Sequence, residues 1–278
     1  DFSIIKEIPW AELILERLKS KKKDSWMPLR NRLLGSPLFS WNERQALLAL
    51  EGVWVGAEQD SGFQDALSRL LAEREKEDIS NALRIIILKC LERSPRPLLI
   101  ASAYNHLPEE KNKLTKVVQK VIQDARPKKN EAFVVLLEGG LPFAIIEGEV
   151  DEWLRLNADK IFADDLLIQC CKSAKGNSRY YLGNHLSKWL DSYGTKFRAN
   201  LVLRAALTPV RSQDKNDKLQ LVADSYVERW LEEFQEDARA RFVIGPWLRS
   251  KGKDVLKCKA IGGHISNWIE RFKNEHIA

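Results

Sequence analysis

The chain has 278 residues, of which 44% are hydrophobic, so it can bury a sizeable core as one elongated domain or as two compact ones. Lysine and arginine number 45 against 39 acidic residues, and this net charge of +6 permits binding to nucleic acid without requiring it. No apolar run approaches the roughly 18 residues of a membrane-spanning helix, so we expect no membrane association and a cytoplasmic location.

Residues 1–80 form the least regular part of the predicted structure. Apolar side chains recur at helical spacing over residues 10–18 and 63–71, which predicts short helices there. Because this region does not follow the repeat found further along the chain, we expect an irregular helical cap. The chain begins with Asp-Phe-Ser and shows no basic start followed by an apolar stretch, so we interpret it as a fragment of a longer protein.

The remainder, residues 81–278, carries a tandem repeat that is clearest around Trp189, Trp230 and Trp268. An aliphatic residue lies three positions before each tryptophan, Leu or Ile follows it directly, and an aromatic residue lies four positions after it. This spacing places the side chains on one face of a helix. His185 and His264 both lie four positions before a tryptophan, and we interpret them as structural residues rather than metal ligands.

A second apolar stripe follows each of these helices. It begins with a small residue ten positions after the tryptophan, Ala199 or Ala240, and continues with larger aliphatic residues. The small residue lets a second helix approach the first closely, and the larger ones fill the space between them. Gly194 suits the end of a first helix, and Thr195 or Asp237 suits the N-cap of a second one. Each repeat is therefore predicted to be a helical hairpin.

Weaker copies of the pattern extend the array toward the N-terminus, and one of them runs from Trp153 to Cys170 and Cys171. The corresponding positions of the six copies recur at intervals within the range of helical-hairpin solenoids, and they are Cys90, Val121, Trp153, Trp189, Trp230 and Trp268. The last copy lacks its second helix. The sequence therefore predicts an all-α fold, with an irregular helical region over 1–80 and an α-solenoid of about six hairpins over 81–278.

Tandem hairpins of this length resemble HEAT-like and tetratricopeptide-like arrays. The HEAT-like pattern fits better, because Leu directly follows Trp here and the alanine lies ten positions after it. The combination of Trp189-Leu190 with an alanine and two aliphatic residues over 199–203 also resembles repeat regions of bacterial multidomain signalling and NTPase defence proteins. That resemblance implies a sensor or partner-binding array that regulates an effector domain outside this chain.

Motifs for catalysis and cofactor binding are missing from the sequence. It contains no phosphate-binding loop, dinucleotide fingerprint, hydrolase elbow or zinc-protease motif, so we expect no enzyme activity, cofactor or metal. The adjacent pair Asp164-Asp165 diverges around a helix and is interpreted as a solvated face. The four cysteines form no C-x-x-C pair and are expected to be reduced core thiols. A helical-repeat DNA glycosylase fits less well, because packing explains the recurring tryptophans.

Basic residues supply the candidate binding surface. Three groups are distinguished by their predicted position: one early loop, a second loop, and the second helices of the hairpins. They are Lys21, Lys22 and Lys23; Lys128 and Lys129; and Arg198, Arg204, Arg239, Arg241 and Arg249. If the second helices line one face of the array, their arginines could contact phosphates or an acidic partner. A merely solvated face is the alternative, because acidic residues are interspersed nearby.

Two hypotheses for function follow. The first is a non-catalytic sensor or scaffold that binds a protein partner or another domain of its parent chain. The second is a nucleic-acid-binding solenoid that contacts phosphates through the second-helix arginines. A salt titration separates them, because affinity for nucleic acid falls steeply as salt concentration rises.

Overall fold

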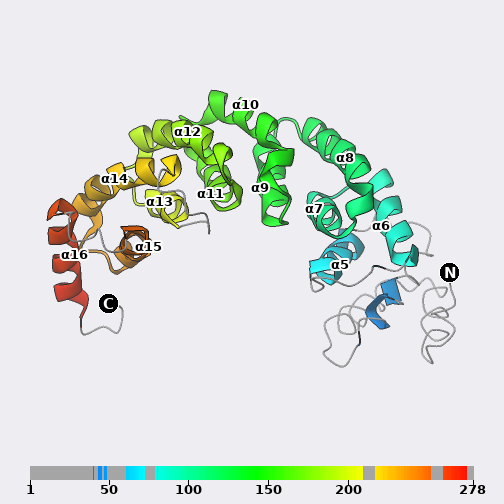
Figure 1. Cartoon of the computed structure of the whole chain (residues 1–278), viewed down its shortest axis with the longest axis horizontal. Coiled ribbons are helices and arrows are strands. Elements are labelled where there is room, and N and C mark those ends of the chain that lie inside the picture. The colour runs from blue at the N-terminus through cyan, green and yellow to red at the C-terminus, as the bar shows by residue number, and fades with distance from the viewer. Residues whose placement is uncertain are drawn as a thin grey trace. The chain divides into compact units, whose positions relative to one another are not determined.

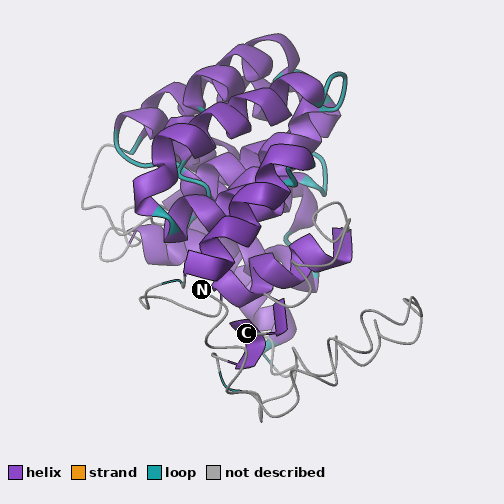
Figure 2. Cartoon of the chain, turned by 90° about the vertical axis from the view of Figure 1, so that its right-hand side faces the viewer, coloured by secondary structure: helices purple, strands orange, loops and turns teal. Residues whose placement is uncertain are grey.

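The computed structural model describes residues 81–208, 217–251 and 259–273, together with 61–72, residue 79 and positions 40, 43–45, 47 and 48. In this part of the chain the regular structure is helical, with no strand (Figure 2). The predicted all-α class is thus confirmed for the described residues. Contacts divide the chain into two compact units, residues 1–141 and 142–278. None of the described helices is both long and apolar enough to cross a membrane.

The first unit is organised around one short, almost fully buried helix. Its helices are α5 (Ser61–Ala72), α6 (Asn81–Arg93), α7 (Pro97–His106), η2 (Pro108–Glu110), α8 (Lys111–Asp124) and α9 (Lys129–Glu138). Helix α7 packs against α5, α6, α8 and α9, and its six consecutive residues from Leu99 to Tyr104 are all buried. A helix with neighbours on several sides needs apolar or small residues all round, which explains its lack of a polar face. Helix α5 confirms the helix predicted over residues 63–71.

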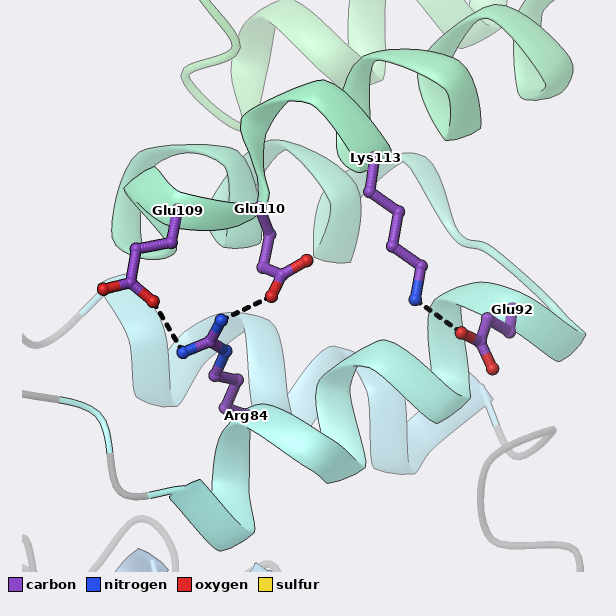
Figure 3. Close-up of polar contacts among 5 residues, drawn as sticks. All are labelled: Arg84, Glu92, Glu109, Glu110 and Lys113. Atoms are coloured by element: carbon purple, nitrogen blue, oxygen red, sulfur yellow. Dashed lines mark hydrogen bonds and ion pairs between the residues drawn. The ribbon is translucent and has the colours of Figure 1, made fainter.

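Ion pairs connect α6 to the hairpin that follows it (Figure 3). The Arg84 guanidinium on α6 donates to the carboxylates of Glu109 and Glu110 in η2, with a Nη1 to Oε2 distance of 2.7 Å for Glu109. Near the other end of α6, Lys113 of α8 donates to Glu92 over 2.6 Å and lowers the pKa of that carboxyl. We expect these pairs to set the register between α6 and α8. They should add little stability, because solvent screens exposed ion pairs.

The helices of the second unit pack in two rows. They are η3 (Phe143–Ile145), α10 (Glu147–Asn157), η4 (Ile161–Ala163), α11 (Asp164–Ser173), α12 (Asn177–Tyr193), α13 (Ala199–Leu207), α14 (Lys218–Phe234), η5 (Ala238–Ala240), α15 (Arg241–Lys251) and α16 (Lys259–Phe272). In one row α10, α12, α14 and α16 each contact the next, and in the other α11 contacts α13 and α13 contacts α15 (Figure 1). The rows meet through α11 with α12 and through α14 with α13 and α15. The predicted stripes of this unit all lie on helices.

The repeated tryptophans are core residues in three of the four hairpins where they occur. Trp189 and Trp230 are 0% exposed and Trp268 is 4% exposed, which confirms the packing prediction for all three. Each indole packs on the aromatic ring four residues later, with ring centres 5.3, 4.9 and 5.3 Å apart. Trp153 is only partly buried, so its prediction as a core residue is wrong. The position four residues after it is Asn157, which offers no ring to pack on.

Two indole N–H groups fasten their helices to the hairpin before them. Trp230 donates from Nε1 to the carbonyl of Lys196, and Trp268 donates to the carbonyl of Asp237, both over 3.1 Å. Each acceptor lies in the segment that joins the two helices of the preceding hairpin. A buried N–H needs an acceptor, and each of these carbonyls accepts the indole N–H in addition to a backbone N–H, from Ala199 and Ala240 respectively. The contact therefore recurs along the row and links successive hairpins.

The hairpin of Trp189 makes the same connection with a different atom. The Trp189 indole N–H is buried and has no hydrogen-bond partner among the described residues. Four residues later, the hydroxyl of Tyr193 donates to the carbonyl of Asp159 in the preceding connecting segment, over 3.2 Å. The other two hairpins have phenylalanine at that position and cannot make this bond. One aromatic donor thus serves each connection, from either of two positions on the helix.

A buried arginine at the start of α12 joins the ends of several helices. Arg179 is 3% exposed; its Nε donates to Asp217 over 2.6 Å and its Nη1 donates to the carbonyl of Cys171 over 2.7 Å. Its Nη2 reaches the carbonyl of Ala206 at 3.5 Å. Asp217 also caps α14 by accepting from the backbone N–H of Leu219. The guanidinium therefore satisfies carbonyls that the last turns of α11 and α13 leave without helical partners.

Three of the cysteines are buried and form no disulfide, as the sequence predicts. They are Cys90, Cys170 and Cys171, and Cys258 lies outside the described residues. Burial raises the pKa of Cys170 well above its ordinary value and raises that of Cys171 to about 12. Both thiols therefore stay protonated near neutral pH, and they lack the thiolate character that a reactive cysteine needs.

Candidate functional site: a basic face on helices α13 and α15

The structure separates the predicted basic residues into different places. Lys21, Lys22 and Lys23 lie outside the described residues. Lys128 and Lys129 lie at the start of α9 in the first unit, where Lys128 pairs with Glu131 over 3.3 Å. The five predicted arginines all lie in the second unit, close to or within α13 and α15. Among the basic residues that the structure describes, the arginine group alone combines several predicted residues on neighbouring helices.

Arg198 is the counter-ion of a buried carboxylate. It forms an ion pair with Asp164 at the start of α11 and a longer one, of 3.5 Å, with Asp165. The side chain of Asp164 is 1% exposed, and burial raises its pKa although Arg198 acts in the opposite direction. The prediction of a solvated face for Asp164-Asp165 is therefore wrong for Asp164 and holds for Asp165, which is exposed. The sequence near Asp164 does not show this burial, because its partner Arg198 lies in the next hairpin.

Arg198→Ala is expected to lower the free energy of unfolding by about 1–3 kcal/mol, because the buried Asp164 carboxylate would lose its counter-ion. The loss is smaller than for a fully buried ion pair because the Arg198 side chain is half exposed. Urea denaturation followed by circular dichroism measures this. The deficit should shrink as pH falls through the raised pKa of Asp164, since a neutral carboxyl needs no counter-ion. Arg204→Ala is the control and should change stability by less than about 0.5 kcal/mol. Equal losses for both variants would contradict the assignment.

Arg239 is held by a carboxylate and by an aromatic ring. Its Nε and Nη2 donate to the two oxygens of Asp237 over 2.9 and 2.8 Å, and this pairing lowers the pKa of the Asp237 carboxyl. Its guanidinium carbon lies 4.0 Å from the centre of the Phe197 ring in the preceding hairpin. Arg198 and Arg239 occupy equivalent repeat positions, and both are engaged by carboxylates. Their recurrence is therefore explained by contacts within the fold.

The other three arginines have no carboxylate partner among the described residues. Arg204 projects from α13, whereas Arg241 and Arg249 project from α15, and all three are exposed. The guanidinium carbons of Arg204 and Arg241 lie 5.2 and 4.9 Å from the centre of the Phe242 ring. Leu201, one turn before Arg204 on the same face of α13, is 46% exposed. We refer to Leu201, Arg204, Arg241, Phe242 and Arg249 as the basic face.

The charges of the basic face favour an anionic ligand. The two guanidinium carbons next to Phe242 lie within about 10 Å of each other, because each is about 5 Å from the same ring centre. Cation–π contacts hold arginine side chains in place without neutralising them. A carboxylate or phosphate placed between Arg204 and Arg241 would relieve their repulsion and accept charge-assisted hydrogen bonds. The ring and Leu201 supply apolar surface next to that position.

The Asp224 carboxylate of α14 anchors α15 and so positions the basic face. Trp247 on α15 is 0% exposed and donates from Nε1 to Asp224 of α14 over 2.6 Å, and Lys251 pairs with the same carboxylate. Neither Asp224 nor Phe242 is among the binding residues that the sequence predicts. Asp224 lies on a first helix between Ala223 and Ser225, so no local signal marks it. Phe242 lies between apolar repeat positions, directly after Arg241, and a basic-aromatic pair on a second helix would have been the signal.

The repeated histidines make structural contacts within the row formed by α10, α12, α14 and α16. His185 of α12 contacts Asp151 of α10 over 2.7 Å, and His264 of α16 contacts Gln235, just after α14, over 2.9 Å. Ligand atoms of His264, Glu228 and Glu232 lie within 4.8 Å of one another. Because the His264 ring already has a partner and Glu232 faces solvent, we interpret this group as a polar contact between α14 and α16.

Comparison of the chain with protein-family models, with curated proteins and with solved structures gives no match. The family resemblance inferred from the repeat therefore remains a proposal.

Proposed function

We propose that the hairpins of residues 81–278 belong to a HEAT-like solenoid that acts as a non-catalytic scaffold or sensor module. The two-row packing of the second unit supports the fold, because each helix contacts its counterpart in the next hairpin. The recurring bonds from Trp230 and Trp268 to the preceding hairpin support it as well. Arrays of this kind bury their hydrophobic core between neighbouring repeats and offer their long exposed faces to partners.

The partner that best fits the basic face is an acidic segment of a protein, either a separate chain or another domain of the parent protein. Arg204 and Arg241 lie next to the partly exposed Phe242 ring, and Arg249 is exposed further along α15. None of the three has a carboxylate partner among the described residues, and this combination carries the proposal. Protein interfaces combine arginine and aromatic side chains with apolar neighbours such as Leu201. Acidic side chains would be drawn to the arginines, while an apolar side chain of the partner would pack on Leu201 and Phe242.

Charge reversal of the basic face is expected to abolish partner capture. The triple variant Arg204→Glu, Arg241→Glu and Arg249→Glu should recover at least about tenfold less partner from extracts of the source cells, because like charges now oppose the acidic segment. Quantitative pull-down measures this. A matched control reverses three exposed basic residues outside the basic face, Arg155, Lys175 and Arg229. If the triple variant and the control variant recover a partner equally well, the assignment of the basic face as the binding surface is refuted.

A nucleic-acid-binding solenoid is the second candidate, favoured by the same three arginines. Arg198 and Arg239 are already engaged by carboxylates, which leaves few cations for a run of phosphates and favours the protein partner. If nucleic acid is the ligand, log affinity should fall linearly with log salt concentration, and Arg204→Ala with Arg241→Ala should flatten that slope by about 2. Absence of binding to DNA and RNA at low salt would eliminate this candidate.

A further inference from the structure

A pocket lies between the start of α10 and the start of α12 in the second unit. Its volume is about 240 Å³, and it is lined by Phe143, Glu147, Gly148, Asp151, Ser178, Tyr181 and Leu182. The α10 residues share one helical face, as do those of α12, so two facing helix surfaces form the walls. Helices α10 and α12 contact each other directly, and η3 adds Phe143. The fold therefore holds the pocket in shape through its own packing.

The pocket has an apolar floor and an acidic wall. Phe143 and Leu182 are buried at its base, whereas the Tyr181 ring is 58% exposed at the rim. Glu147 and Asp151 lie one turn apart on α10, and no lysine or arginine lines the pocket. Asp151 is held by the His185 ring over 2.7 Å, while Glu147 makes no hydrogen bond or ion pair among the described residues. An apolar cavity with two carboxylates selects for an organic cation.

We propose that this pocket binds the guanidinium group of an arginine presented by a partner polypeptide. A guanidinium is planar and carries five N–H donors, so it can donate to Glu147 and Asp151 together and stack on the Tyr181 ring. Its aliphatic stem would lie on Phe143 and Leu182. A volume of about 240 Å³ suits one side chain and is small for a larger ligand. The inference does not rest on the basic face, which lies on other helices.

Gly148 gives a way to close the pocket without disturbing the fold. A Cβ atom at this position would meet no atom within 4 Å, so the space next to the glycine is open. Gly148→Leu should therefore fill the pocket while leaving its walls in place. Leucine also favours the helical conformation more than glycine does, so the variant should fold at least as well as the natural chain.

Ligand-observed NMR with the complete chain tests the proposal. The probes are a capped tripeptide with a central arginine, the same peptide with citrulline, which is the uncharged isostere, and ethylguanidinium. We expect the arginine peptide to bind at least about tenfold more tightly than either of the others, because charge and backbone both contribute. Equal binding of the citrulline peptide would overturn the role of the carboxylates. Equal binding of ethylguanidinium would overturn the polypeptide source, and no binding by any probe would overturn the site.

Variants of the pocket complete the test. Glu147→Gln with Asp151→Asn, and separately Gly148→Leu, should each weaken the arginine peptide at least about tenfold, with thermal melts confirming that both fold. Glu152→Gln removes one carboxylate charge from an exposed position of α10 that does not line the pocket, and it should bind as the natural chain does. The Arg204, Arg241 and Arg249 triple reversal should also bind normally, so failure of the basic face and failure of the pocket are distinguishable. Unchanged binding in both pocket variants would refute the proposal.

Discussion

Arg179→Met should lower the free energy of unfolding by about 3–5 kcal/mol, the range for removing one partner of a buried ion pair. The loss of the guanidinium leaves the Asp217 carboxylate, 10% exposed, without its cation, and leaves the carbonyls of Cys171 and Ala206 without their donor. Methionine keeps much of the aliphatic bulk, so the result reports mainly the lost polar contacts. Equilibrium urea denaturation measures the change.

A second substitution identifies the source of this loss. Asp217→Asn removes the charge but keeps an oxygen that can accept from Leu219 at the N-cap of α14. In the Arg179→Met background it should therefore recover part of the lost stability, because no unpaired buried charge remains. Arg229→Ala is the control, since Arg229 is exposed and contacts the Tyr226 ring, and it should change stability by less than about 0.5 kcal/mol. Strict additivity of the two substitutions would show that the pair is not coupled.

The helices were predictable because their signal is local. The second stripe of the Trp189 hairpin consists of residues whose spacing alone assigns them to one helical face. All five of them are buried: Ala199, Val202, Leu203, Ala206 and Leu207. Most of the predicted N-terminal region lies outside the described residues, and the predicted boundary at residue 80 stays a prediction. The contacts place a division between Leu141 and Pro142, where the repeat pattern itself continues without a break.

The polar contacts were not predictable because they join residues about thirty positions apart. Arg179 and Asp217 are separated by 38 positions, and nothing in the sequence near either one marks the other as its partner. The same is true of Arg198, which the repeat alignment assigned to an exposed stripe although its guanidinium pairs with Asp164. The basic face could be predicted only as a set of arginines on second helices. Which of them lack carboxylate partners depends on how neighbouring hairpins pack.

Trp189→Ala should cost about 3–5 kcal/mol of unfolding free energy, because its indole is fully buried and its removal leaves a cavity between hairpins. Trp153→Ala should cost clearly less, since that ring is partly exposed and contacts Phe162 at an edge, with ring centres 6.0 Å apart. Thermal and urea denaturation of the two variants give the comparison. Similar losses would mean that Trp153 is as much a core residue as Trp189.

Phenylalanine substitutions separate the packing of the indole from its hydrogen bond. Trp230→Phe should cost about 1 kcal/mol more than Trp189→Phe, because only the Trp230 N–H donates to a carbonyl of the preceding hairpin. In the Trp189 hairpin that role belongs to Tyr193, so Tyr193→Phe should cost about 1 kcal/mol through the lost bond to Asp159. If Trp189→Phe costs more than Trp230→Phe, the Trp189 N–H donates a hydrogen bond in solution. Tyr193 would then not replace Trp189 as the donor to the preceding hairpin.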